Sequence, residues 1–183
     1  MGPELLAVRH APVGVSGICY GQSDVPVAVP PDEAATRVAE ALGRWVPTAI
    51  WSSPLSRCHD VASLLESQLS VPLRVTDELL EMSFGEWEWR PWEELMRLDG
   101  QRLQTWMDNW REERPPGGES AEDLLARVSG WWQALDRGSD QLLIAHSGVV
   151  RALRVITGSS WDDSMKEPVP HLAVERFSLM PPV

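Results

Sequence analysis

The sequence predicts an α/β fold, a three-layer α/β/α sandwich built around a mostly parallel sheet. Short apolar runs at 5–8 and 141–145 end abruptly in polar residues, which is typical of strands buried in a parallel sheet. Apolar residues at helical spacing fill longer stretches between such runs, for example at 32–46. Strands that alternate with helices along the chain place helices on both faces of the sheet.

Each expected element follows from its local pattern. Ser120, followed three residues later by Asp123, predicts a helix start through a variant of the capping box. The run at 173–179 alternates in polarity, as a final strand does. In chain order we expect a strand at 5–8, a helix at 32–46, a strand at 49–52, a helix at 56–69, a strand at 73–75, helices at 92–98 and 102–110, a helix after Ser120, a strand at 141–145, a helix at 149–156 and the final strand.

The length of 183 residues and the absence of any repeat or linker predict one domain, 1–183. The stretch 82–119 is expected to form a cap or insertion over the strand ends. It ends in a charged loop rich in proline and glycine.

Charge and composition exclude several kinds of partner. The net charge of −11 argues against nucleic acid and anionic membrane surfaces, and no apolar run is long enough to span a bilayer. Cys19 and Cys58 are the only cysteines, and no charged and apolar leader precedes Leu5. A cytoplasmic protein without disulfides is therefore expected. The oligomeric state stays open, with a homodimer as one arrangement.

Two histidines and two arginines indicate an anion site. Arg9-His10 ends the first apolar run, His146 ends the run at 141–145, and Arg57 opens the helix at 56–69. The ends of parallel strands meet in one crevice, where ligands bind. Guanidinium groups match phosphate geometry, and imidazole is a nucleophile or a donor near neutral pH. The pattern predicts a pocket for a phosphoryl group.

Five segments carry a family resemblance: VRHAP, SSPLSRC, LLEMSFGEWEW, PPGGESAEDLLARV and AHSGVVRAL. In this order, from Leu5 to Thr157, they resemble the motifs of the histidine phosphatase superfamily, the phosphoglycerate mutase-like enzymes. The segment GICYGQSDVPV further resembles the alpha-ribazole phosphatase branch. The chain departs from the family at Ala11 and Trp89, where the family usually has glycine.

The resemblance implies a role for each residue of the anion site. His10 is expected to attack phosphorus and to become a phosphohistidine, which water then hydrolyses. Arg9, Arg57, His146 and Ser147 are expected to bind the phosphoryl oxygens, and the two arginines also disfavour protonation of His10.

Glu81 matches the family position of the general acid that protonates the leaving group. Phe84 and Trp87 are expected to desolvate it. Glu78, Glu86 and Glu88 lie close enough in sequence to replace it, although a solvated surface is the preferred interpretation for these three.

Other residues have two readings. Gln22 and Ser23 either contact the leaving group or belong to a plain loop, and Trp87, Trp89 and Trp92 either pack in the core or line a substrate pocket. His59 and His171 are expected to be surface or packing residues. Four further tryptophans are expected in the core: Trp106, Trp110, Trp131 and Trp132. Trp106 and Trp110 are four residues apart and are expected to share one helix face.

The sequence therefore predicts a phosphomonoesterase that needs no cofactor. A metal site is not expected, because the four histidines and two cysteines form no HxxxH or CxxC pair. Its substrate is expected to be a small soluble phosphate ester, with alpha-ribazole phosphate as the first candidate. One alternative is a phosphoglycerate mutase-type phosphotransferase, although the family's mutases are longer. The other is a catalytically inactive module that binds a phosphorylated ligand.

Overall fold

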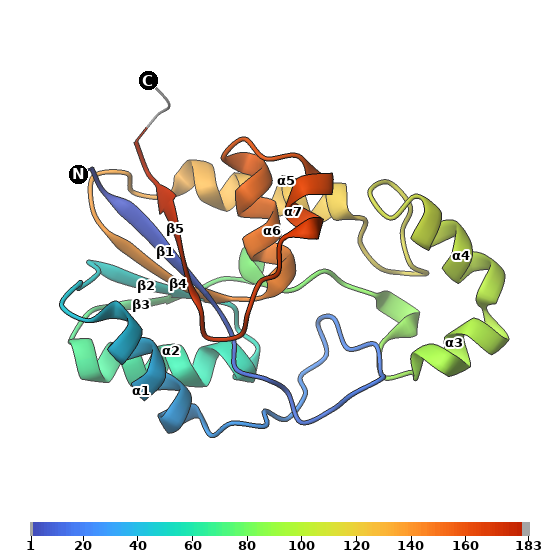
Figure 1. Ribbon diagram of the computed structural model, residues 1–183, viewed down its shortest axis with the longest axis horizontal. Helices are drawn as coiled ribbons and strands as arrows, with labels where there is room; N and C mark the ends of the chain where they lie inside the picture. Colours follow the sequence, from blue (N-terminus) through green and yellow to red (C-terminus); the bar gives the residue numbers. More distant parts are fainter. Residues whose placement is uncertain (1, 181–183) are drawn as a thin grey trace.

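A five-stranded sheet forms the centre of the computed structural model, which describes residues 2–180 (Figure 1). The strand order is β3-β2-β4-β1-β5, and only the edge strand β5 runs antiparallel to its neighbour. The strands are β1 (Glu4–Arg9), β2 (Ala49–Ser52), β3 (Leu73–Val75), β4 (Gln141–Ala145) and β5 (Val174–Ser178).

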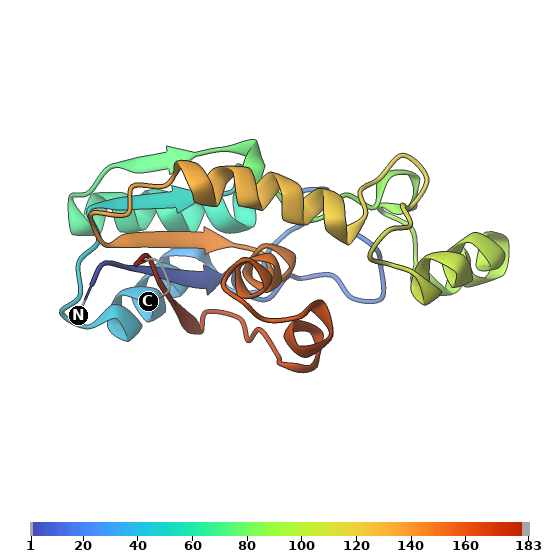
Figure 2. The ribbon, with the colours of Figure 1, turned by 90° about the horizontal axis from the view of Figure 1, so that it is seen from above.

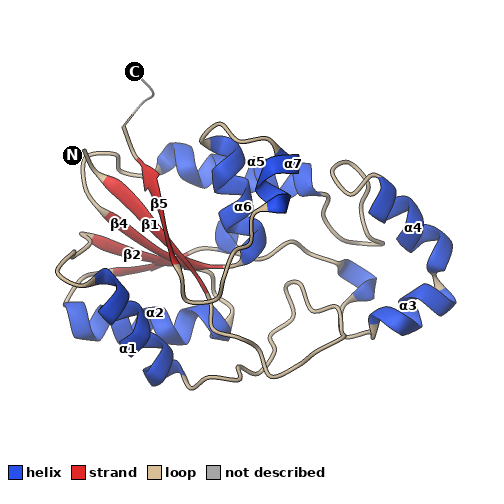
Figure 3. Cartoon of the chain, viewed as in Figure 1, coloured by secondary structure: helices blue, strands red, loops and turns tan. Residues whose placement is uncertain are grey.

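Helices cover both faces of this sheet, so the predicted α/β/α sandwich is confirmed (Figure 3). Alternation along β1 divides the core between the faces, because neighbouring side chains of a strand point to opposite sides. Leu6 and Val8 pack with α1 and α2, whereas Leu5 and Ala7 pack with α5 and α6. The helices are α1 (Pro31–Leu42), α2 (Ser56–Leu69), α3 (Trp92–Leu98), α4 (Gly100–Asp108), α5 (Ala121–Ala134), α6 (Ser147–Ile156) and α7 (Trp161–Lys166).

The helices differ from the predictions in several places, and α6 begins at Ser147 rather than at residue 149. The helix expected at 32–46 ends at Leu42, because Gly43 takes a positive φ of 62° and leaves the helical path. The helix expected at 102–110 spans Gly100–Asp108, so Trp110 lies outside it and does not share a helix face with Trp106. The six-residue helix α7 was not predicted, because so short a segment has little periodicity to detect.

The helices α3 and α4 lie beyond the carboxyl ends of the parallel strands. The strand arrowheads point toward the end of the molecule that these helices occupy (Figure 2). A small apolar cluster of Cys19, Trp87, Leu95 and Leu103 holds the α3–α4 segment together. The sheet edge that ends in His10 and His146 therefore faces this segment.

Among residues 2–180, no helix combines the length and the apolar character that crossing a membrane requires.

Candidate active site

His10 follows β1 directly and is almost fully buried, with 2% of its surface exposed. Its Nδ1 lies 2.6 Å from the carbonyl oxygen of Ala11. A carbonyl only accepts hydrogen bonds, so Nδ1 carries the proton and Nε2 keeps a free lone pair. Burial lowers the pKa of His10 to about 3, and the charges of Arg57 and Arg9 act in the same direction. His10 is thus a neutral imidazole with one nitrogen available for attack.

His146 occupies the matching position after β4. Strands β1 and β4 pair in parallel, with Arg9 opposite Ala145, so the residues after them lie side by side. The ring centroids of His10 and His146 are 5.2 Å apart. Arg57 Nε donates to His146 Nδ1 at 3.3 Å, which leaves the proton of this ring on Nε2 as a donor. Burial, reinforced by the Arg57 charge, lowers the pKa of His146 well below its ordinary value.

Arg57 is buried at the start of α2 and is held by the loop that follows His10. Its guanidinium donates to the carbonyl oxygens of Gly21 at 2.6 Å and Ser23 at 2.8 Å. Carbonyl partners leave the positive charge of the guanidinium uncompensated. The arrangement is therefore suited to an incoming anion.

Glu88 organises this loop, which corrects the expectation that its side chain is solvated. The carboxylate accepts hydrogen bonds from the backbone of Gln22 at 2.9 Å and of Ser23 at 2.7 Å, and also from the Ser23 hydroxyl. It further accepts from Phe84 N at 3.0 Å. Glu78 and Glu86 are exposed, as expected.

The side chains of Gln22 and Ser23 bond within the protein. The Gln22 amide donates to the carbonyl oxygen of Glu81 at 3.0 Å, and the Ser23 hydroxyl donates to Glu88. Both side chains therefore help to shape the loop, and their contact with the leaving group stays a prediction.

Arg9 extends from the end of β1 toward the segment before β5. One nitrogen of its guanidinium donates to Val169 O at 2.8 Å, whereas its buried Nε has no hydrogen-bond partner among the described residues. Its charge lies near enough to contribute to the lowered pKa values of His10 and His146. The site thus has guanidinium groups on two different elements.

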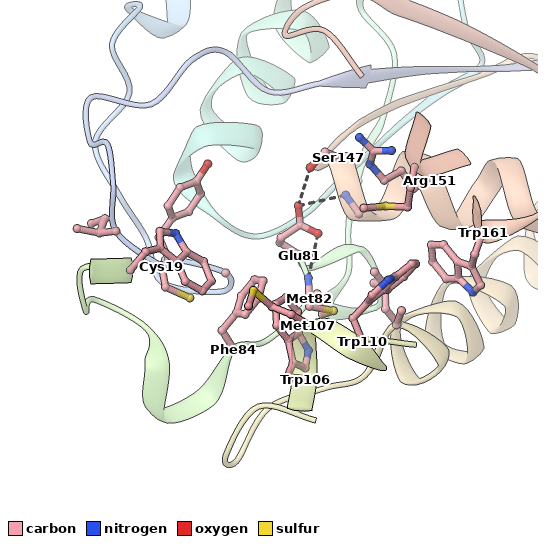
Figure 4. A pocket seen from close by; sticks show the side chains of 18 residues that line it. Cys19, Glu81, Met82, Phe84, Trp106, Met107, Trp110, Ser147, Arg151 and Trp161 are labelled. Atoms are coloured by element: carbon pink, nitrogen blue, oxygen red, sulfur yellow. Dashed lines mark hydrogen bonds between the residues drawn. The ribbon is translucent and has the colours of Figure 1, made fainter. Parts of the chain in front are cut away.

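Glu81 lies against the first turn of α6, with its carboxylate next to Ser147 (Figure 4). Its Oε2 accepts from Gly148 N at 3.2 Å and from Ser147 Oγ at 3.3 Å, and its Oε1 accepts from Met82 N at 3.0 Å. A Cβ on residue 148 would lie 2.1 Å from Glu81 Oε1, so this approach requires glycine. The Ser147 hydroxyl faces Glu81, and the expected contact of Ser147 with a phosphoryl oxygen, through its backbone N–H, stays a prediction. Arg127 fixes the preceding backbone by donating to Leu80 O at 3.0 Å.

His171 belongs to this cluster, although we expected a surface or packing residue. Its Nδ1 lies 2.7 Å from His10 O, and its ring centroid is 5.3 Å from that of His10. The antiparallel pairing of β5 with β1 brings the residues before β5 next to those after β1. His59 is partly exposed and contacts Asp60 at 3.5 Å.

An apolar cavity of about 420 Å³ opens next to Glu81 (Figure 4). Four tryptophans line it: Trp92, Trp106, Trp110 and Trp161. Trp106 and Trp110 also pack against the apolar clusters of the protein, so each joins the core to the cavity wall. Trp131 and Trp132 are buried core residues, as expected. The other described residues lining the cavity are Ile18, Cys19, Tyr20, Gly21, Glu81, Met82, Phe84, Met107, Ala121, Leu124, Ser147, Gly148, Arg151 and Met165.

Trp87 and Trp89 do not line this cavity, so their predicted contact with substrate is not supported. Trp87 is 1% exposed and donates from its indole nitrogen to Asp99 at 2.8 Å. Trp89 is 54% exposed and has a φ of 63°, a backbone conformation that favours glycine. This backbone conformation explains why glycine suits position 89.

Within residues 2–180, no three His, Cys, Asp or Glu side chains are arranged to share one metal ion.

The neutral state of His10 predicts a loss of stability in acid. Its pKa is 6.5 in the unfolded chain and about 3 in the folded protein, so the unfolded state binds more protons between these values. The stability that the protein gains from keeping His10 neutral is fully present above pH 6.5 and is lost as the pH falls toward 3. Lowering the pH from 7 to 5 should cost about 2 kcal/mol of unfolding free energy through His10.

Urea unfolding at pH 7 and pH 5 measures this loss. His10→Gln should reduce the loss by about 2 kcal/mol, whereas His59→Gln, on the partly exposed side of α2, should not. An equal pH dependence in the His10 variant and the unmodified protein would contradict the neutral buried state.

Comparison with known proteins agrees with this geometry. Residues 5–179 match the histidine phosphatase superfamily (branch 1). The adenosylcobalamin/alpha-ribazole phosphatase of Escherichia coli K12 is 27% identical over 155 residues, which cover 82% of this chain and 76% of that protein. The glucosyl-3-phosphoglycerate phosphatase of Mycobacterium tuberculosis H37Rv is 30% identical over 167 residues, covering 82% and 73%.

Solved structures show the same fold. The alpha-ribazole phosphatase of Shigella flexneri superposes with a TM-score of 0.82 at 24% identity, covering 94% of this chain and 89% of that one. YhfR of Bacillus stearothermophilus gives a TM-score of 0.83 at 20% identity, covering 95% and 90%.

Proposed function

Because the chain belongs to the histidine phosphatase superfamily (branch 1), we propose that it is a phosphomonoesterase that works through a phosphohistidine at His10. The observation that carries the proposal is the state of His10. Its Nδ1 is fixed on Ala11 O, its Nε2 is free, and the buried Arg57 lies close by. Relatives named as phosphatases support the same activity.

In the first step, His10 Nε2 attacks phosphorus in line with the leaving oxygen. The N–P bond forms as the P–O bond breaks, and the electron pair of that bond goes to the leaving oxygen. Arg9, Arg57 and the Nε2–H of His146 stabilise the negative charge on the other phosphoryl oxygens.

Glu81 serves as the acid of this step. Its protonated carboxyl gives the proton to the leaving oxygen of the bound substrate. In the second step, ionised Glu81 accepts a proton from water, which attacks phosphorus and breaks the N–P bond. Inorganic phosphate and neutral His10 are the products. A module that only binds a phosphorylated ligand has no use for this carboxyl.

Residues 82–119 are proposed to act as a cap over the strand ends. This segment supplies Met82, Phe84, Trp92, Trp106 and Trp110 to the cavity next to Glu81. Excluding water from the leaving group is the expected benefit.

The substrate is proposed to be a small phosphate ester in the cytoplasm, with alpha-ribazole phosphate as the first candidate. The names of the Escherichia coli and Salmonella typhimurium relatives support this choice. The net charge of −11 disfavours nucleic acid and anionic membranes as partners.

The test is a turnover screen with alpha-ribazole phosphate, 3-phosphoglycerate and simple sugar phosphates in the presence of EDTA. We expect release of inorganic phosphate, with the highest kcat/KM for alpha-ribazole phosphate. Chelation should leave the rate unchanged, because guanidinium and imidazole groups neutralise the transferred group. Vanadate should inhibit by imitating that group.

Two outcomes would contradict parts of this proposal. Activity that is lost in EDTA and restored by Mg²⁺ or Zn²⁺ would show that a metal takes part. Labelled phosphoryl exchange between glycerate phosphates that outpaces phosphate release would instead show a mutase.

A further inference from the structure

We propose that the apolar cavity beside Glu81 binds the leaving group of the substrate and selects an aromatic, uncharged one over an acidic one. The inference rests on the proposed phosphatase function and adds the chemical class of the substrate.

The position of Glu81 connects the cavity to the reaction. Its carboxylate lies on the first turn of α6, immediately after His146, and also forms part of the cavity wall. Neither His10 nor His146 lines the cavity, whereas Ser147 and Gly148, the two residues after His146, line it together with Glu81. A leaving oxygen that takes the proton of Glu81 therefore lies at the junction of the phosphoryl site and the cavity. The rest of the leaving group extends into the cavity.

Indole rings from different elements shape the cavity. Trp92 comes from α3, Trp106 from α4, Trp110 from the loop after α4, and Trp161 from α7. Trp110 and Trp161 pack edge to face, with centroids 5.5 Å apart. Such packing holds the rings in fixed orientations, and fixed aromatic walls favour flat apolar ligands.

Phe84 packs against two of these rings. Its centroid lies 5.8 Å from that of Trp92 and 5.7 Å from that of Trp106, both edge to face. At the rim, Met107 and Met165 are about half exposed. Methionine adapts its shape to the ligand, so the rim tolerates leaving groups of different outline.

Charge in the cavity works against a second anion. Among the described lining residues, Glu81 and Arg151 carry the only full charges. Their opposite charges give the lining no net positive charge to attract a second anion, and the Arg151 guanidinium is held beside α7 by the backbone carbonyls of Ser164 and Glu167. A carboxylate on the leaving group would lose its hydration between apolar rings and would approach Glu81, and both effects weaken binding.

The test compares three esters of primary alcohols, so that the leaving oxygens differ little in basicity: 2-(1-naphthyl)ethyl phosphate, ethyl phosphate and 3-phosphoglycerate. We expect kcat/KM for the naphthyl ester to exceed the values for the other two by at least about ten-fold.

Met107→Arg places a cation at the cavity rim on an exposed position, so the fold should tolerate it. This variant should reduce the ratio of kcat/KM for the naphthyl ester to that for 3-phosphoglycerate by roughly ten-fold or more. Met96→Arg is the matched control, because Met96 is 65% exposed on α3 and does not line the cavity. The control should keep the ratio of the unmodified protein.

The outcomes separate the inference from the proposed function. Turnover of all three esters without a preference, or the same ratio in Met107→Arg and Met96→Arg, overturns the inference and leaves the phosphatase in place. Absence of turnover on every ester overturns the proposed function itself.

Discussion

Replacing His10 with alanine is expected to lower kcat by roughly 10⁴- to 10⁶-fold, because the variant lacks the atom that accepts the phosphoryl group. His10 Nε2 is the free nitrogen of a neutral ring, since Nδ1 is bonded to Ala11 O at 2.6 Å and burial holds the pKa at about 3. His146 does not take its place, because its Nε2 carries a proton.

The covalent adduct gives a second readout. During turnover of a labelled ester, a quench in alkali should retain label on the protein and a quench in acid should lose it, as a phosphoramidate requires. His10→Ala should carry no label under either quench. His59→Ala is the control on the partly exposed side of α2 and should label normally. Label that persists in His10→Ala would assign the nucleophile elsewhere.

Replacing Glu81 with glutamine is expected to separate substrates by the basicity of their leaving group. Alkyl phosphates need a proton on the leaving oxygen, so their kcat should fall by roughly 10²- to 10⁴-fold. The leaving oxygen of p-nitrophenyl phosphate is stable without a proton, so its kcat should change far less. Steady-state rates on both substrates measure the difference.

A second variant tests the same role without removing the carboxylate. In Gly148→Ala, the new Cβ would lie 2.1 Å from Glu81 Oε1 and would push the carboxylate away from α6. We expect the same preference for p-nitrophenyl phosphate, with a smaller loss on alkyl esters. Equal losses on both substrates in Glu81→Gln would show that Glu81 is not the acid.

The positions of His10 and His146 were predictable because they depend on local patterns. Each follows a short apolar run, and both runs are strands that the structure confirms as β1 and β4. The capping box at Ser120 is equally local, and the structure confirms it. Helix ends were less predictable, because Gly43 ends α1 through a backbone conformation that periodicity does not reveal.

Glu81 was identified by resemblance, but the reason for glycine at position 148 was not visible in the sequence. The two residues are 67 positions apart and meet only because α6 begins beside the segment that Arg127 fixes. The spacing of residues in the sequence does not reveal that Glu81 and Gly148 come into contact.

By itself, the sequence determined the layered fold and the two strands after which His10 and His146 lie. It could do so because strand and helix periodicity are properties of neighbouring residues. Only the tertiary structure decided that Glu88 holds the loop after His10, that His171 lies beside His10, and that Trp110 and Trp161 line a cavity while Trp87 is buried. The contacts of Glu88 and His171 join residues 65 and 161 positions apart. Whether a tryptophan is in the core or in a cavity wall depends on how whole elements pack, which no local pattern records.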